Sequence, residues 1–190
     1  MYLFRFLAGE RYKLGVRVGE IALDLEAVSP DVPCDIARIL NEWQRFKPII
    51  EAAFDAPDDS ARLAFDSIIY GIPIQAPEKI ICVGLNYAAH AAESTYQKVP
   101  EYPVLFIRFP STLVPHKGNI IKPSCSDKLD YEGELAVIIS QKAYHVQKEE
   151  ALNYVGGYTI FNDASVRDYQ KRTSQWTLGK NFDATGGRWS

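Results

Sequence analysis

A run of alternating acidic residues that leads straight into an apolar segment places the strongest constraint on this sequence. Asp130, Glu132 and Glu134 are each separated by one residue, and the apolar run 135–139 follows at once. The run is rich in β-branched residues and predicts a strand. Residues i and i+2 of a strand share a face, so the pattern predicts three neighbouring carboxylates. Either bulk water or a hard divalent cation such as Mg²⁺, Mn²⁺ or Ca²⁺ can offset their repulsion.

Composition limits the classes of protein to consider. The chain has 190 residues, 47% hydrophobic and 24% charged, which is typical of one globular domain or of one with a small companion. Its net charge of −3 gives no electrostatic reason to expect a nucleic acid or an anionic membrane as partner. No apolar run approaches membrane-spanning length. Cys34, Cys82 and Cys125 are odd in number and lack metal-type spacing, so we expect reduced thiols in a cytoplasmic protein.

The N-terminal part has the pattern of a small β unit followed by a helix. Segments 2–7, 12–18 and 21–25 have strand composition and are separated by glycine-containing turns. Segment 34–54 then carries apolar residues at helical spacing, and Pro48 is expected to split or kink it. Nothing in this part suggests chemistry.

Prolines mark a boundary between two domains. Pro73 and Pro77 flank a short linker, and we place the boundary near Ala76. The predicted domains are therefore 1–76 and 77–190. The second opens with an apolar strand at 79–85, which its composition predicts to be buried on both faces.

Two further groups of residues suggest a site. His90 and Glu93 are three apart and would share a helix face, where the carboxylate could tune the imidazole as a general base. The alternative is an ordinary surface pair. Asp163, Arg167 and Gln170 would stack on one side of a helical turn and suit an anionic, oxygen-rich ligand beside a metal. The alternative there is a helix cap followed by a surface ion pair.

Five blocks of sequence, taken together in their order, resemble the fumarylacetoacetate hydrolase family. They are 84–90, 130–137, 157–163, 167–170 and 175–183, the last containing the Gly-Lys-Asn-Phe motif. The resemblance covers the chain from about Lys79 to Phe182, and the small N-terminal β domain also fits it.

The resemblance implies a role for eight residues and leaves one acidic residue aside. Its implied metal ligands are Glu132, Glu134 and Asp163; its catalytic residues are His90, paired with Glu93, and Lys180 near the substrate oxygens; its substrate-binding residues are Arg167 and Gln170. Asp130 matches no family ligand and is expected to be solvated or to lie behind the ligands. Only two of the three carboxylates predicted on one strand face are therefore implied metal ligands.

The fold and function implied by the resemblance are specific. We expect a mainly β protein with α elements (α+β), in which a small N-terminal β domain precedes an incomplete version of the family's mixed β-sandwich roll. The implied activity is hydrolysis of a C–C bond in a dicarbonyl or oxo-acid substrate, fumarylacetoacetate-like or acylpyruvate-like, with Mg²⁺ (or Mn²⁺ or Ca²⁺). The alternatives are an isomerase or decarboxylase of an aromatic-degradation intermediate, or an inactive truncated member.

The end of the chain carries its own expectation. Family catalytic domains continue well past the Gly-Lys-Asn-Phe motif, whereas this sequence stops at Ser190. We therefore expect unpaired strand edges, an incomplete pocket and little activity from these residues alone. An intact version is expected to be a homodimer.

Overall fold

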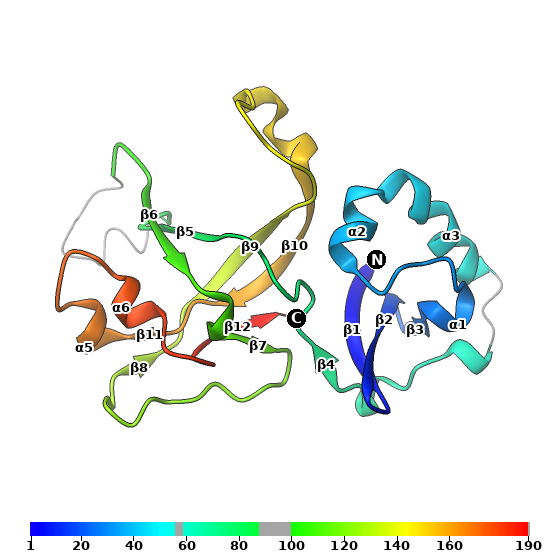
Figure 1. Ribbon diagram of the computed structural model, residues 1–190, viewed down its shortest axis with the longest axis horizontal. Coiled ribbons are helices and arrows are strands. Elements are labelled where there is room, and N and C mark those ends of the chain that lie inside the picture. The colour runs from blue at the N-terminus through cyan, green and yellow to red at the C-terminus, as the bar shows by residue number, and fades with distance from the viewer. Residues whose placement is uncertain (56–58, 88–99, 190) are drawn as a thin grey trace.

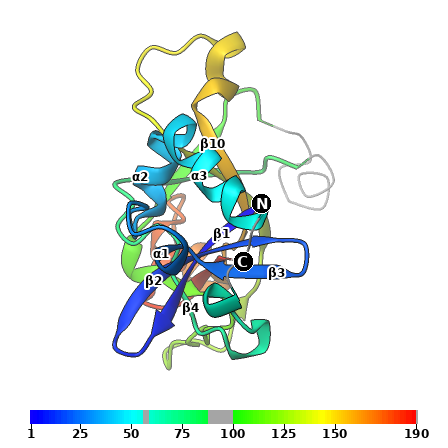
Figure 2. The ribbon, with the colours of Figure 1, turned by 90° about the vertical axis from the view of Figure 1, so that its right-hand side faces the viewer.

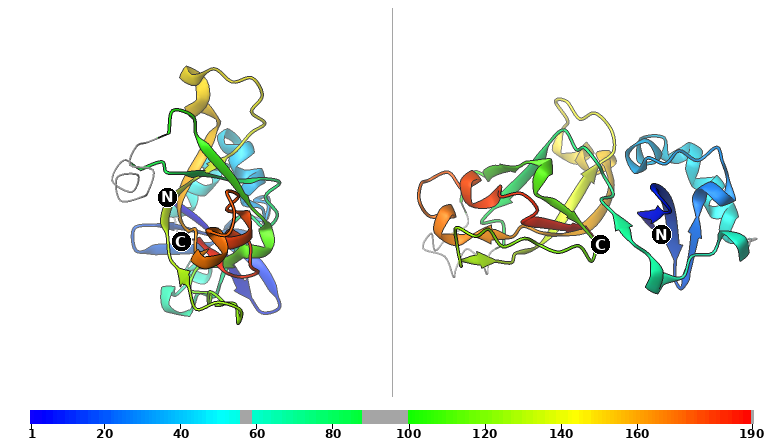
Figure 3. Two further views of the ribbon diagram at one scale, coloured as in Figure 1. Left: turned by 90° about the vertical axis from the view of Figure 1, so that its left-hand side faces the viewer. Right: turned by 60° about the horizontal axis from the view of Figure 1, so that its bottom comes forward.

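The computed structural model describes residues 1–55, 59–87 and 100–189, which form two lobes (Figure 1). One lobe contains the elements up to β4 (Tyr70–Gly71), and the other begins at β5 (Ile80–Gly84). The right-hand view in Figure 3 shows the same separation from another direction. The boundary near Ala76 falls between these strands and stays a prediction.

The N-terminal lobe is built on an antiparallel sheet of four strands in the order β3-β2-β1-β4. Its first three strands are β1 (Tyr2–Ala8), β2 (Arg11–Val18) and β3 (Ile21–Asp24), close to the predicted segments. Tight turns join them, and Gly9 and Gly19 adopt φ values of +64° and +55° there, which favour glycine. The expected three-stranded meander is therefore present, with β4 added at the edge of β1.

Three helices follow this meander and cover one face of the sheet (Figure 2). They are α1 (Leu25–Val28), α2 (Ile36–Asn41) and α3 (Trp43–Asp55). Leu14, Val16 and Leu23 of the sheet share a buried core with Ile39 and Phe46 of the helices.

The helical segment is not split at Pro48, and the alternative of a kink there stays a prediction. The helical segment is interrupted at Glu42, and α3 continues through Pro48. Pro48 is the sixth residue of α3, past the four N-terminal amides that have no partner within a helix, so α3 continues there with one backbone hydrogen bond missing.

The second lobe consists of short paired strands joined by loops and single helical turns. The antiparallel pairs are β5 with β6 (Val104–Arg108), β8 (Leu129–Asp130) with β11 (Ser165–Val166), and β9 (Gly133–Ile139) with β10 (Val155–Asn162); β7 (Leu113–Pro115) pairs in parallel with β12 (Gly186–Trp189). The helical turns of this lobe are η3 (Pro110–Thr112), η4 (Lys148–Tyr154), α5 (Arg167–Gln170) and α6 (Thr177–Lys180), whereas η1 (Asp59–Ala61) and η2 (Phe65–Ser67) belong to the N-terminal lobe. Strands predominate, so the predicted mainly β fold with α elements is confirmed.

Two of these strand pairs have one apolar face in contact with solvent. The expectation that β5 is buried on both faces was wrong, because Ile81 and Val83 are exposed and only the alternate positions face inward. In β9–β10, Leu135 and Ile160 pair directly across the strands and are 61% and 63% exposed. Each of these strand pairs therefore buries only one of its two faces.

The lobes touch at a glycine in β10. The strand pairing shifts register between Val155 and Gly157. A Cβ added at Gly156 would lie 3.2 Å from Leu40 Cδ1 of α2, so glycine permits the two lobes to approach here.

No helix in the described ranges has the length and apolar character needed to span a bilayer.

Candidate functional site

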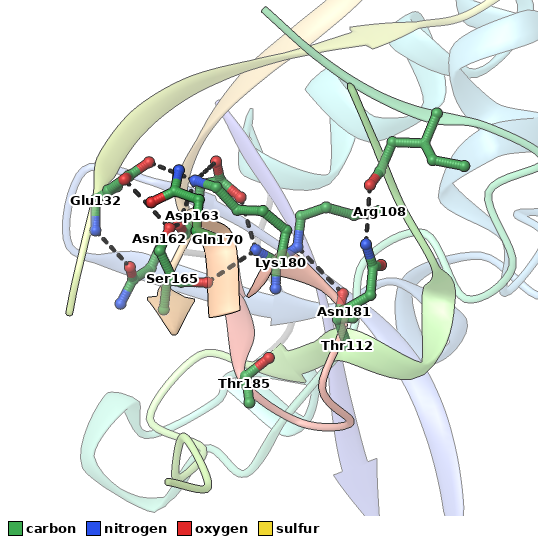
Figure 4. A network of polar contacts seen from close by, with 12 residues as sticks. Arg108, Thr112, Glu132, Asn162, Asp163, Ser165, Gln170, Lys180, Asn181 and Thr185 are labelled. Carbon is green, nitrogen blue, oxygen red and sulfur yellow. Dashed lines mark hydrogen bonds and ion pairs between the residues drawn. The ribbon is translucent and has the colours of Figure 1, made fainter. Parts of the chain in front are cut away.

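The centre of the site lies where two neighbouring strands change partners together. Glu132 lies between β8 and β9, and Asp163 lies between β10 and β11. The Asp163 amide donates to the Glu132 carbonyl at 2.8 Å, and the Glu132 amide donates to Asn162 Oδ1 at 3.1 Å. These bonds continue the antiparallel pairing across both breaks, so the two acidic residues are held side by side (Figure 4).

The predicted row of three carboxylates on one strand face was wrong for Asp130. This residue ends β8, and Tyr131 and Glu132 separate it from the start of β9. Asp130 is exposed, and its Oδ2 lies 2.9 Å from Arg167 Nη2. It therefore stands outside the carboxylate pair, as the resemblance implies.

Lys180 enters the site from α6 because α6 packs tightly on α5. A Cβ added at Gly179 would overlap the backbone of Gln170, so only glycine allows this approach. Asn181 fixes the end of the helix: its Nδ2 donates to Ile107 O at 3.0 Å, and its Oδ1 accepts from Phe109 N at 2.7 Å. The Gly-Lys-Asn motif therefore positions one lysine beside the end of β6.

Lys180 joins the two central carboxylates. Its Nζ lies 2.6 Å from Glu132 Oε2 and 2.6 Å from Asp163 Oδ2, and the side chain is 2% exposed. The structure thus brings together three of the predicted site residues, which are 17 and 48 positions apart in the chain.

Arg108 also belongs to this network, although the sequence pattern did not single it out. Its Nη1 lies 2.6 Å from Asp163 Oδ1 and donates to Ala164 O at 3.1 Å, while its Nε donates to Thr112 Oγ1 at 3.3 Å. The signal was its position in β6: it shares the inward face with Val104 and Phe106. A cation on the buried face of an apolar strand requires a buried partner.

Arg167 and Gln170 lie on the outer side of Glu132. Arg167 Nη1 contacts Glu132 Oε1 and donates to Gln170 Oε1 at 3.0 Å. The expected stacking of both residues with Asp163 was wrong: α5 begins only at Arg167, and β11 turns the chain between them. Asp163 therefore faces Arg108 and Lys180 instead.

Comparison with known proteins identifies the family. The family model described as fumarylacetoacetate (FAA) hydrolase C-terminal matches residues 79–187, which is more than half of the chain. The chain belongs to the fumarylacetoacetate hydrolase family. Its relatives include a fumarylacetoacetate hydrolase domain-containing protein 2 homolog of Dictyostelium discoideum, which is 38% identical over 92% of this chain and 58% of its own length.

Other members of the fumarylacetoacetate hydrolase family are similar in sequence or in fold. The protein named oxaloacetate tautomerase fahd2, mitochondrial, of Xenopus laevis is 36% identical over 91% of this chain and 54% of its own length. A maleylpyruvate hydrolase from Sphingobium sp. SYK-6, solved with a manganese(II) ion and pyruvate, is 25% identical and has a TM-score of 0.77; the match covers all of this chain and 65% of that one. The chain therefore spans about 54–65% of the length of these relatives.

The three acidic residues differ in pKa because their surroundings differ. Burial alone would raise the pKa of Glu132, but Lys180 and Arg167 together outweigh burial and lower it. Burial raises the pKa of the more enclosed Asp163, and Lys180 and Arg108 offset only part of that increase. Burial also raises the pKa of Glu134, aided by the charges of Asp163 and Glu132.

Glu132, Glu134 and Asp163 offer carboxylate oxygens, which are the ligands that a hard divalent ion prefers. Two of these three carboxylates are already bridged by a side-chain cation. Lys180 fills the space between Glu132 and Asp163, and within the ranges described no three His, Cys, Asp or Glu side chains are grouped to hold a metal. Glu134 stands opposite Phe161 in the β9–β10 pairing. The residues therefore fit a divalent ion by the chemistry of their oxygens, and Lys180 occupies the position between two of them.

The remaining predicted catalytic residues are His90 and Glu93, and both lie outside the described residues. One surface cavity of about 330 Å³ lies in the N-terminal lobe, and another of about 310 Å³ lies between that lobe and Pro115 of β7. They include Arg11 and Arg5 in their linings and contain none of the network residues. The candidate site is therefore defined by the network itself.

Proposed function

We propose that this chain forms the metal-binding and substrate-binding part of an enzyme that acts on an oxo acid. Glu132, Glu134 and Asp163 would hold a divalent ion, Mg²⁺ or Mn²⁺, and Lys180 would face the substrate oxygens. When bound, the ion supplies positive charge next to an oxygen that becomes enolate-like during reaction.

The observation that carries this proposal is the bridge from Lys180 to both Glu132 and Asp163. Ion pairs are costly to bury unless their geometry is good, and this cluster is both enclosed and connected. Concentrations of buried charge with shifted pKa values occur preferentially at functional sites. Arg167, whose side chain is 27% exposed, adds a cation within reach of an incoming carboxylate.

Proton transfer is the step assigned to residues of this chain. His90 would take a proton from the substrate or deliver one to it, and Glu93 would orient the imidazole. Lys180 and Arg167 would hold the anionic oxygens of the substrate during that transfer.

Two reactions share this step. Tautomerisation of a short oxo diacid is favoured by the Xenopus relative named an oxaloacetate tautomerase, which is 36% identical to this chain. Hydrolysis of a C–C bond in an acylpyruvate-like acid is favoured by the maleylpyruvate hydrolase structure, which is 25% identical. We rank tautomerisation first because the sequence identity to the tautomerase is higher than that to the hydrolase.

Cys34, Cys82 and Cys125 are free thiols, which supports the proposal of a cytoplasmic, reducing location.

A substrate comparison tests the proposal. A full-length version of this chain should be assayed with Mn²⁺ and with Mg²⁺ for loss of the enol form of oxaloacetate and for hydrolysis of maleylpyruvate and an acylpyruvate. His90→Ala should lower kcat by about 10²–10⁴ and leave metal binding unchanged, as expected for loss of a general base. Glu93→Gln should cost less, because it orients the imidazole. Absence of both reactions, or an unchanged kcat in His90→Ala, would refute the assignment.

A further inference from the structure

We propose that Lys180 is an internal substitute for the metal ion: its ammonium occupies the ion's position, and the ion binds by displacing it. This inference rests on the proposed metal site. The same carboxylate oxygens would contact the Lys180 ammonium in the metal-free state and the divalent ion in the metal-bound state.

Two distances place the Lys180 ammonium at the position proposed for the ion. Lys180 Nζ lies 2.6 Å from one oxygen of each of two proposed ligands, Glu132 and Asp163. A divalent ion bound by those oxygens would lie about 2.0–2.6 Å from each of them. The ammonium and the ion would therefore occupy the same space, and only one can be present.

The division of oxygens among the cations identifies which one must leave. Arg108 contacts Oδ1 of Asp163, and Arg167 contacts Oε1 of Glu132. Lys180 takes the other oxygen of each residue, Oδ2 and Oε2. The two arginines can stay in place and hold the carboxylates while Lys180 exchanges with the ion.

A displaced Lys180 side chain has an alternative position beside the Phe106 ring. Its four-carbon side chain is flexible and ends in a compact charge. Its Nζ already lies 5.0 Å from the centre of the Phe106 ring, whose face attracts a cation. A displaced ammonium can thus remain beside the site, where it can meet an anionic substrate oxygen.

The exchange has a measurable consequence, because a cation that must be expelled lowers metal affinity. Without the metal, Lys180 neutralises two enclosed carboxylates that would otherwise repel each other. Without the ammonium the two carboxylates repel each other, and binding of the ion relieves that repulsion. The affinity for the ion should therefore rise when Lys180 is replaced by a neutral side chain of similar length.

The experiment compares Mn²⁺ binding by three variants, using the electron paramagnetic resonance signal of free Mn²⁺ and calorimetry. Lys180→Met should bind Mn²⁺ at least about tenfold more tightly than the original chain. Arg167→Met removes a positive charge from the same Glu132 without opening the bridging position, so its gain should be clearly smaller. Lys142→Met removes a charge from an exposed lysine after β9 and should leave the affinity unchanged.

The outcomes separate this inference from the proposed function. Equal gains in Lys180→Met and Arg167→Met, or no gain in Lys180→Met, would overturn the exchange while leaving the metal site intact. Absence of Mn²⁺ binding in all the proteins would overturn the metal site and the exchange together. If Lys180→Met folds poorly, thermal unfolding with and without Mn²⁺ decides: the ion should raise its Tm more than that of the original chain, and an equal or smaller rise would refute the exchange.

Discussion

Arg108 Nη1 lies 2.6 Å from Asp163 Oδ1 in a pair whose side chains are 0% and 4% exposed. The two residues are 55 positions apart, and their contact fixes the end of β6 against the junction of β10 and β11. Loss of Asp163 would leave the Arg108 guanidinium buried without this carboxylate, and loss of Arg108 would leave Asp163 paired with Lys180 but its Oδ1 without this donor.

Arg108→Met should therefore lower the free energy of unfolding by about 1–3 kcal/mol, the cost of leaving a buried acceptor without its donor. Arg108→Lys should recover part of the loss, since it keeps the charge and loses the additional bonds to Ala164 and Thr112. Urea unfolding followed by circular dichroism measures both. Arg62→Met is the matched control: it removes a similar pair with Asp59, 2.8 Å long but exposed, and should have a much smaller effect. Similar losses at the two sites would contradict the role given to burial.

Glu132→Ala and Asp163→Ala should each abolish binding of Mg²⁺ or Mn²⁺ in calorimetry. Each removes a carboxylate from the proposed ligand set. Asp130→Ala removes a carboxylate from the same segment that the structure places outside the pair, and it should leave binding intact. Unchanged binding in the first two variants would remove the metal assignment.

Glu134→Gln should stabilise the metal-free chain at neutral pH. Burial raises the pKa of Glu134 above its ordinary value of 4.5, so the folded state holds this proton more tightly than the unfolded state. Stability is therefore lost as pH rises from 4.5 through the folded pKa, and glutamine, which does not titrate, avoids that loss. Urea unfolding in a chelator at about pH 4 and about pH 7 should show a gain only at the higher pH. Glu149→Gln, at an exposed position in η4, controls for the change in net charge.

Cys82 should resist alkylation while the chain is folded. Burial, with a further contribution from the charge of Asp163, raises the pKa of its thiol from 9.0 to about 12, so little reactive thiolate forms near neutral pH. Cys34 and Cys125 are exposed and should react with iodoacetamide first. Mass spectrometry of digested samples reads out each site, and labelling in urea should modify all three. Equal labelling of Cys82 in the folded chain would contradict its placement in β5.

The exposed apolar face of β9–β10 should cause the chain to self-associate, in keeping with the proposed homodimer. Leu135 and Ile160 lie opposite each other on this face, and apolar patches of this kind favour association. Leu135→Lys should shift the population toward monomer in light scattering coupled to size exclusion. Leu152→Lys changes a more exposed leucine in η4, away from this face, and should have less effect. A monomer at all concentrations would contradict the prediction.

Local pattern in the sequence determined the elements and the acidic positions of the site. Alternation and β-branched composition predicted the strands at 135–139 and 158–161, and both lie within the observed β9 and β10. Those patterns act over two to four residues, which is the range of strand and helix periodicity. They could place Glu132 and Glu134 near each other and could suggest oxygen ligands.

Only the tertiary structure decided which charges meet. Asp163 was expected to face Arg167, which is four residues away, yet it contacts Arg108 and Lys180, which come from β6 and α6. Strand pairing at the β8–β9 and β10–β11 junctions and the close packing at Gly179 create these contacts. Periodicity along one segment carries no information about a neighbour 55 residues away, because that proximity arises from hydrogen bonds and packing between segments.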